Sequence, residues 1–593
     1  MNHTPLLTST TDPRVSDRVV YVPADPFDVY ALLSEPRDDV AAREPILLIG
    51  PWGWEDISAH RPLRTWAHHL ARRGHPVLRI DLPGSGDSAG DPKHPDLVGA
   101  WRAGILAAAT ALATSQGAPE VRVIALGLPG LVVVDGLRHD DASAIGDVAL
   151  WGVASRGRTV IRQLQAFAQL ERSTAAIDEH GEQIDDVEVA DSRLAPGGYL
   201  LTDETQAGLR ATDATTVPAE VLAGRRVLLL ERDGMAVDAK LRAHLEASGA
   251  TVSTAHGDGY GRMVEHPQTS TLPAAVVTTV DGWLDEVAAA PATTPGGPLG
   301  ADTLDLDGVR ESPLRVADGG PGVFGIVSEP DGPRSHELTV VFLNAGGQRH
   351  VGPNRMWVEA ARRWAAGGVP SVRIDVGSLG DAPGPDLVAH TGEELHNPTV
   401  VAQVRAALDL VVARGLPSTF MIVGLCSGAW MGFNAALGDP RVRSTVLINA
   451  RALVWSSALG DVRDARVGKR IVKRSQWKRV LRGDIERERI IEILKAIANY
   501  PVGAVKSLKI RRQVTAALQR QSDAGVLVSL IFTGNEPLRG ELERDGALDL
   551  VRERPGLQVV ELAGRDHSLR PMSEQQLGHE LLDADLRRVL AAD

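Results

Sequence analysis

The sequence predicts two α/β domains in tandem, each a mostly parallel sheet flanked by helices with helical cap insertions. Three observations predict this class: a length of 593 residues, a long internal repeat, and an alternation of strand and helix patterns in each half. The predicted organisation is an N-terminal tail over 1–17, a first domain over 18–287, a linker over 288–311 and a second domain over 312–593.

The repeat has a constant shift of 294 residues, as from Val29 to Val323. Three pairs of segments show it: VYALLSEP (29–36) with VFGIVSEP (323–330), VLRIDLPGSGD (77–87) with SVRIDVGSLGD (371–381), and GPWGWED (50–56) with NAGGQRH (344–350). A period this long indicates duplication of a whole domain rather than a solenoid repeat. The stretch AAPATTPGGPLG (289–300) between the copies has the Pro- and Gly-rich composition of a linker.

Within each half, short apolar runs end in loops and alternate with helical patterns. The first half has PILLIG (45–50), RTWAHHLARRG (64–74), VLRID (77–81) and VRVIALG (121–127). The second half has LTVVFLN (338–344), WVEAARRWAAGG (357–368), SVRID (371–375) and TFMIVG (419–424). Buried strands that alternate with helices ending in glycine predict right-handed βαβ units and a parallel sheet.

Composition excludes several classes of protein. A net charge of −13 argues against general nucleic-acid binding. No apolar run is long enough for a transmembrane helix, and the first residues lack the pattern of a secretory signal. One cysteine excludes a disulfide framework and a cysteine-based zinc site, and no metal or cofactor motif is present. We therefore expect a cytoplasmic protein without a metal or a cofactor.

The one cysteine, Cys426, lies in the stretch VGLCSGAW (423–430), between a predicted strand and a predicted helix. A residue on such a sharp turn projects its side chain above the sheet, and glycines two residues before and after it, Gly424 and Gly428, relieve the crowding of the backbone. The positive end of the helix dipole favours a thiolate there. The pattern predicts that Cys426 is a nucleophile rather than a small buried filler.

The same turn predicts an oxyanion hole. One donor is the backbone N–H of Ser427, directly after the nucleophile. The second donor comes from the loop after an earlier strand, where we place Ala345 and Gly346 in the hole and Asn344 in contact with the substrate.

A nucleophile of this kind needs a base, and the base needs an orienting acid. His567 follows a predicted strand near the C-terminus and comes after the nucleophile in chain order. Glu536 follows the strand before it, in the turn Gly534-Asn535-Glu536, and is the candidate acid. Asp545 and Asp566 are alternative acids, and Asp566 is adjacent in sequence to the histidine.

With these motifs the chain resembles the α/β-hydrolase superfamily, most closely bacterial serine-aminopeptidase-like and exosortase-associated hydrolases. The resemblance covers roughly residues 18–287 and 312–591. It implies that Cys426, Glu536 and His567 are nucleophile, acid and base. The sequence departs from the family in having cysteine where most members have serine. Cysteine also occurs at this turn in dienelactone hydrolases and in polyhydroxyalkanoate synthases, which are transferases.

The first half lacks the residues for nucleophilic catalysis. We place Pro129 at the central position of its turn, where proline has neither a nucleophilic atom nor an N–H. Asp233 and His266 fall at the acid and histidine positions without a nucleophile. We expect a structural or substrate-shaping half that pairs with the active half as subunits of a homodimer do. Its loop, with Trp52 and Trp54, either closes over the active half or packs between the halves.

A cap is predicted at about 452–522 in the second half. From Arg463 to Arg512 it has 16 Lys or Arg against 5 Asp or Glu. Such a lid attracts an anionic acyl donor, a coenzyme A thioester or an acyl carrier protein, with Arg474 and Lys478 as the candidate binding residues. The alternative is a solvated basic face, which pairs with the acidic insertion (153–192) of the first half.

These features predict an acyl-processing enzyme that forms an acyl-cysteine intermediate from a thioester or an ester. It is either a thioesterase or other hydrolase, or an acyltransferase. Thiolates exchange readily with thioesters, and this chemistry favours thioester donors. The other function class is a non-catalytic binding or scaffold protein in which both turns are inactive.

Overall fold

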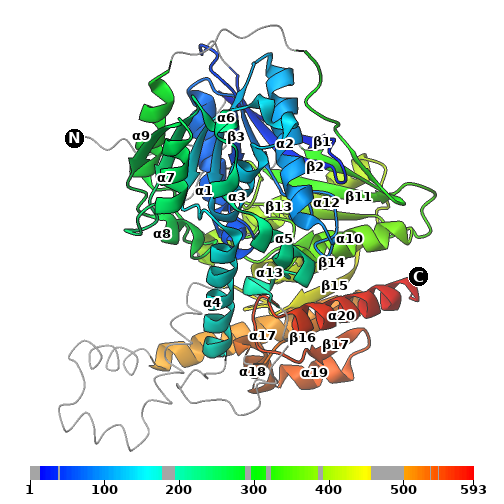
Figure 1. Ribbon diagram of the computed structural model, residues 1–593. Helices are drawn as coiled ribbons and strands as arrows, with labels where there is room; N and C mark the ends of the chain where they lie inside the picture. The colour runs from blue at the N-terminus through cyan, green and yellow to red at the C-terminus, as the bar shows by residue number, and fades with distance from the viewer. Residues whose placement is uncertain are drawn as a thin grey trace, which may run out of the picture.

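The computed structural model describes residues 14–37, 40–175, 194–287, 296–315, 322–384, 392–455, 500–534, 536–544 and 546–592. These residues form two mixed, mostly parallel sheets flanked by helices (Figure 1). The first sheet uses residues from Val15 to Ala255, and the second uses residues from Leu304 to Glu561. The predicted fold class is confirmed.

The first sheet has the strand order β1-β2-β4-β3-β5-β6-β7-β8. Its strands are β1 (Val15–Val22), β2 (Val29–Pro36), β3 (Ile46–Ile49), β4 (Val77–Ile80), β5 (Val121–Leu126), β6 (Ile145–Trp151), β7 (Arg226–Leu230) and β8 (Thr251–Ala255). β2 is antiparallel to both of its neighbours, and the pairs from β4 to β8 are parallel.

The helices described in the first half cover both faces of this sheet. They are α1 (Trp54–Arg72), α2 (Leu97–Gln116), α3 (Gly127–Gly136), α4 (Gly157–Ala175), α5 (Asp203–Ala211), α6 (Ala219–Leu222), α7 (Ala239–Ala247), α8 (Tyr260–Val264) and α9 (Ala274–Asp285). Among the described helices, α2 is the one long and apolar enough to cross a membrane, but most of its apolar stretch is buried against the first sheet.

The second sheet repeats this order with one more strand, as β17-β16-β15-β14-β12-β13-β11-β10-β9. Its strands are β9 (Leu304–Leu306), β10 (Val309–Arg315), β11 (Val323–Pro330), β12 (Thr339–Leu343), β13 (Ser371–Val376), β14 (Phe420–Leu425), β15 (Val442–Ile448), β16 (Leu527–Phe532) and β17 (Leu557–Glu561). Its helices include α10 (Met356–Ala366), α11 (Gly392–Leu395), α12 (Pro398–Ala413), α13 (Ser427–Ala436), α17 (Tyr500–Asp523), α18 (Pro537–Arg544), α19 (Ala547–Glu553) and α20 (Met572–Leu590).

The register of the strands follows the repeat in the sequence. Ala31 of β2 pairs with Ile80 of β4, and Gly325 of β11 pairs with Ile374 of β13, each 294 residues later. The extra edge strand β9 and the start of β10 lie inside the range 288–311 that the sequence predicts as a linker, and both belong to the second sheet.

The two halves meet through equivalent surfaces. The antiparallel strand pairs of both sheets contribute to one apolar cluster, which contains Val19, Tyr21, Tyr30, Leu32, Ala89, Leu304, Phe324, Ile326 and Ala382. Buried ion pairs surround it. Arg373 pairs with Asp87 at 3.0 Å, and the residues 294 positions away, Arg79 and Asp381, form the reciprocal pair at 3.0 Å. The halves thus contact each other as subunits of a two-fold dimer do.

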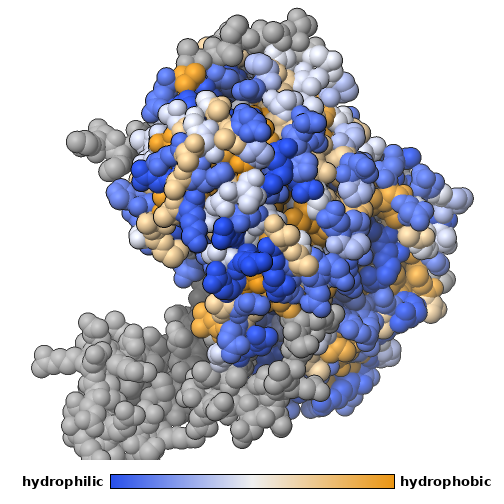
Figure 2. Space-filling model, viewed as in Figure 1, coloured by the Kyte–Doolittle hydropathy of each residue, from blue (hydrophilic) through white to orange (hydrophobic). Residues whose placement is uncertain are grey.

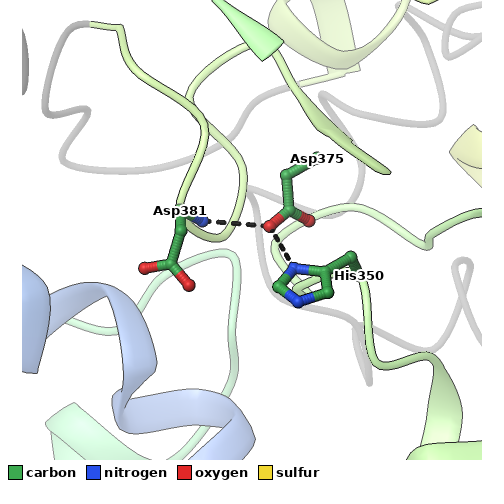
Figure 3. A group of neighbouring side chains, drawn as sticks. All are labelled: His350, Asp375 and Asp381. Carbon is green, nitrogen blue, oxygen red and sulfur yellow. Dashed lines mark hydrogen bonds and ion pairs between the residues drawn. The ribbon is translucent and has the colours of Figure 1, made fainter. Parts of the chain in front are cut away.

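His350 lies at the centre of this interface. Its Nδ1 is 2.6 Å from Asp375, in its own half, and its Nε2 is 2.7 Å from Asp87, in the first half. Asp381 lies beside Asp375, close enough for the three side chains to surround a metal ion (Figure 3). Burial lowers the pKa of His350, but its two carboxylate partners more than offset this and raise the pKa to about 10. An imidazolium that donates from both nitrogens has no lone pair for a metal.

Hydrophilic residues dominate the surface on the face drawn in Figure 2, where apolar side chains of the described residues are scattered. Two of the large apolar side chains that the structure exposes, Phe167 and Leu170, are on α4. This helix projects from the first half towards the second (Figure 1). Most of the predicted cap lies outside the described residues, and only 452–455 and the helix α17 can be placed.

Candidate active site

Cys426 lies between β14 and α13 in the conformation that a nucleophile turn requires. Its φ is 56° and its ψ is −112°, a left-handed conformation that is rare for a side chain larger than hydrogen. The N–H of Cys426 donates to Ile448 O at 2.9 Å, which ties the turn to the end of β15. α13 begins at the next residue, so its N-terminus points to the cysteine.

The two glycines of the turn are required by close packing of the backbone. A side chain at Gly424 would collide with the backbone of Gly428 and Ala429. A Cβ at Gly428 would lie 2.6 Å from Asn344 O, at the end of the neighbouring strand β12. The spacing seen in the sequence therefore reflects the close approach of three backbone segments around Cys426.

Glu536 and His567 come from the loops after β16 and β17. His567 Nδ1 lies 2.7 Å from Glu536 Oε1, and the carboxylate side chain is only 6% exposed. Asn449, which follows β15, links the two loops: its amide donates to His567 O at 2.9 Å, and its Oδ1 accepts from the N–H of Thr533 at 2.9 Å. Asn449 holds the backbone that carries both side chains.

The side chain of His567 also lies near Cys426, which acts on its pKa. The other nitrogen of its ring, Nε2, is buried and has no hydrogen-bond partner among the described residues. Burial lowers the pKa of His567, but its neighbours Cys426 and Glu536 more than offset this and raise the pKa to about 10.

The predicted oxyanion donors lie close to the cysteine. Ser427 is buried at the start of α13, and its hydroxyl donates to Asn344 O at 3.4 Å. The loop after β12 is closed by Gln348, whose N–H donates to Ala345 O at 3.2 Å, and by a hydrogen bond from Asn344 Nδ2 to Arg349 O. Gly346 lies against Leu395 of α11. The structure thus joins Asn344 to Ser427, the residue after Cys426, and Ala345 and Gly346 follow Asn344 in the same loop.

The remaining predicted residues have other placements. Asp566 binds Arg570 at 2.6 Å rather than the ring of His567. Asp545, Arg474 and Lys478 lie outside the described residues. The roles of Arg474 and Lys478 in binding an anionic donor therefore stay predictions.

In the first half, Gly127 rather than Pro129 holds the position of the nucleophile. β5 ends at Leu126 as β14 ends at Leu425, and Gly127 has a φ of 58°, close to that of Cys426. Pro129 lies two residues further on, inside α3. The prediction of Pro129 was wrong because it matched glycine spacing in the sequence, whereas the end of the strand sets the turn. The position still has no nucleophilic atom.

The space that a nucleophile would use in the first half is filled by Tyr260 and Glu55. The Tyr260 hydroxyl donates to Glu55 Oε2 at 2.8 Å, and it would lie 3.1 Å from a Cβ at Gly127. Arg232 pairs with Glu55 at 2.7 Å and stacks on the Tyr260 ring. Sequence reasoning missed this group. The sequence feature that could have indicated it is a tyrosine five residues after β8, close to the position that His567 has after β17.

The predicted remnants of the first half do not form a catalytic pair. Asp233 accepts hydrogen bonds from the N–H groups of Gly259 and Gly261, at 2.6 and 2.7 Å. His266 is exposed, and its Nδ1 lies 3.2 Å from the N–H of Gln268. Trp52 packs within the first half against Trp101 and Tyr199, whereas the ring of Trp54 lies under Arg570 of the second half.

Comparison with known proteins gives structural matches alone. No protein-family model matches the sequence, and no curated protein does. A hypothetical protein from Pseudomonas aeruginosa is 15% identical, with a TM-score of 0.32, and the match covers 48% of this chain and 98% of that one. Est1E from Butyrivibrio proteoclasticus with bound ferulic acid is 15% identical over 45% and 98% of the two chains, with a TM-score of 0.30. A putative dienelactone hydrolase from Klebsiella pneumoniae is 13% identical over 46% and 96%, with a TM-score of 0.28.

Proposed function

We propose that the protein is an acyl-processing enzyme that forms an acyl-cysteine intermediate at Cys426 from a thioester or an ester. The observation that carries this proposal is the arrangement of His567. Its Nδ1 is bound to Glu536 at 2.7 Å, its Nε2 is buried without a hydrogen-bond partner among the described residues, and Cys426 is close enough to help raise its pKa. The conformation of Cys426 and the glycine contacts around it support the same role.

The first step is attack by the Cys426 thiolate on the acyl carbonyl carbon. A carbon–sulfur bond forms, and the carbonyl π electrons move to the oxygen, where the N–H of Ser427 and the N–H groups of the Ala345–Gly346 loop donate to the oxyanion. When the tetrahedral intermediate collapses, the bond to the leaving thiol or alcohol breaks. The leaving group takes the Nε2 proton of His567. Glu536 stabilises the imidazolium until that proton is transferred.

The second step transfers the acyl group from Cys426 to an acceptor. Neutral His567 accepts a proton from water, an alcohol or an amine, which attacks the acyl-cysteine and releases the thiolate. An acyl-cysteine stays reactive towards amines and alcohols, so both hydrolysis and transfer fit the site. The donor that we propose is a coenzyme A thioester or an acyl carrier protein, because the cap sequence is strongly basic while the whole chain is acidic.

Intact-protein mass spectrometry after mixing with acyl coenzyme A tests the proposal. We expect a single acyl adduct in the wild type and none in Cys426→Ala, and the chain has no other cysteine to take up the label. Discharge faster with an added amine or alcohol than with water assigns a transferase, and discharge by water alone assigns a hydrolase. Acyl turnover that survives Cys426→Ala contradicts the covalent mechanism, and the absence of an adduct with any donor supports a binding or scaffold protein.

A further inference from the structure

The loop that carries His567 rests on the first half of the chain. Arg570 Nη1 lies 3.3 Å from Glu171 Oε1, at the end of α4. Gln575 donates to Gly198 O at 2.9 Å, and a side chain at Gly198 would collide with Arg570 O. The Arg570 guanidinium also lies 5.3 Å from the centre of the Trp54 ring. The first half therefore contacts the segment directly after the candidate base.

Within that segment, Asp566 closes the turn that presents His567. Its Oδ1 accepts from the N–H of Ser568 at 2.9 Å and from the N–H of Arg570 at 3.3 Å, so these bonds span the histidine. Its Oδ2 accepts from Arg570 Nε at 2.8 Å and pairs with Arg570 Nη2 at 2.6 Å. Arg570 thus fixes the carboxylate that shapes the turn.

Glu171 fixes Arg570 from the other side. Its Oε2 accepts from the N–H of Gly197 at 2.7 Å while its Oε1 faces Arg570, and the side chain is 25% exposed. The turn needs support of this kind because Leu569 is fully buried with a φ of 56°, a left-handed conformation that is unfavourable for a residue with a side chain. Glu171, Arg570 and Asp566 form a continuous path of charged contacts to the residue next to His567.

The oxyanion loop rests on the first half as well. A Cβ at Gly347 would lie 2.8 Å from the carbonyl carbon of Pro267, and one at Gly346 would lie 2.7 Å from Gln268 Nε2. The loop that carries His567 and the loop after β12 therefore both contact the first half. The first half, which lacks a nucleophile, thus contacts the candidate site of the second half.

We propose that Glu171 is a positioning residue for the chemistry at Cys426, which acts through Arg570 and Asp566 to hold His567 in place. The first half is then part of the active site rather than a separate scaffold. This inference rests on the proposed function of Cys426 and His567.

The variant Glu171→Gln tests it, because glutamine still accepts from Gly197 but has no charge for Arg570. Iodoacetamide reacts with the thiolate, and Cys426 is the one cysteine of the chain, so the alkylation rate reports on its pairing with His567. We expect the rate at pH 7 to fall about tenfold, less than the ~10²-fold that a 1 Å misplacement can cost. At pH 10 and above, where thiols ionise unaided, the rate should equal that of the wild type. kcat should fall with KM unchanged.

Two further variants make this test specific. Glu204→Gln is the matched control, since Glu204 is an exposed glutamate of α5 in the same half, and it should keep the wild-type pH profile. Arg570→Gln also removes the contacts with Asp566, so it should have at least the effect of Glu171→Gln. The double variant should be no worse than Arg570→Gln alone, because the residues act along one path. A wild-type profile for Glu171→Gln, or additive effects in the double variant, overturns the inference.

Hydrogen exchange separates this inference from the proposed function. We expect faster amide exchange at 564–571 in Glu171→Gln and unchanged exchange in Glu204→Gln, whether or not Cys426 accepts an acyl group. If the wild type forms no acyl adduct, the proposed function fails while the exchange result still decides whether Glu171 holds the turn. Unchanged exchange in Glu171→Gln refutes the positioning role even in an active enzyme.

Discussion

Arg373 Nη2 lies 3.0 Å from Asp87 Oδ1, and both side chains are fully buried at the contact between the two halves. Arg373 also binds Glu311 at 2.8 Å, so the guanidinium neutralises one carboxylate from each half. The reciprocal pair of Arg79 and Asp381 is almost as buried. Removal of one partner of such a buried ion pair is destabilising, because the other charge is left buried and uncompensated.

Replacement of Arg373 by methionine should therefore destabilise the whole chain. We expect Arg373→Met to lower the free energy of unfolding by about 3–5 kcal/mol, as measured by urea denaturation. Arg310→Met is the control, because Arg310 pairs with Asp305 on the surface of the neighbouring strand, and its loss should be much smaller. Equal losses in the free energy of unfolding would show that the buried pair contributes no more to stability than the surface pair.

His350 should make stability depend on alkaline pH. Its pKa is raised from 6.5 to about 10 in the folded protein, so the folded state binds this proton more tightly than the unfolded state. The resulting stability is fully present below about pH 6.5 and is lost as pH rises to about 10. Thermal melts from pH 6 to 10.5 should show this loss in the wild type and a flatter dependence in His350→Gln. A parallel decline in both proteins contradicts the assignment.

Glu536→Gln should weaken the pairing of His567 with Cys426. Without a charged acceptor at Nδ1, the pKa of His567 falls below its present value of about 10, and the imidazolium is less favoured at neutral pH. We expect alkylation of Cys426 by iodoacetamide to slow at pH 7 and acyl turnover to fall about 10²–10⁴-fold. Glu543→Gln, on the surface of α18, is the matched control and should behave as the wild type. If Asp566 were the acid, Glu536→Gln would leave both rates unchanged.

A thiol in the first half should not restore chemistry there. In a Cys426→Ala background, the substitution Gly127→Cys places sulfur at the equivalent turn, next to the Tyr260 hydroxyl and without a histidine partner. We expect no acyl adduct by intact mass, and a stability loss of about 1 kcal/mol because the glycine has a φ of 58°. An adduct in this variant would mean that the first half retains a working site.

The strongest sequence signals concerned backbone geometry, and these predicted the fold well. The repeat that relates Val29 to Val323 corresponds to a strand register shared by both sheets. The glycines around Cys426 correspond to close contacts of the backbone. Contacts between the halves could not be predicted in the same way. Arg79 and Asp87 recur as Arg373 and Asp381, and the letters alone allow pairing within a half as well as across the interface.

The errors in the site have similar causes. Glycine spacing in the sequence predicts Pro129 at the turn, but β5 ends at Leu126 and Gly127 holds that position. Tyr260 and Glu55 are 205 residues apart, and no motif marks their hydrogen bond. Glu171 and Arg570, which form the ion pair on the path to His567, are 399 residues apart in the sequence. Only folding of the chain brings them together.

The contact of Trp54 with Arg570 has a consequence for how such a protein can change. Trp54 and Gln348 hold equivalent places in the two copies, yet only Trp54 lies under a loop that carries a candidate base. In a homodimer encoded once, a tryptophan at this place would appear beside both active sites, and a nucleophile removed from one subunit would vanish from the other. Joining the copies in one chain removes that constraint, so each half can be altered alone and the two can divide the work of a single reaction.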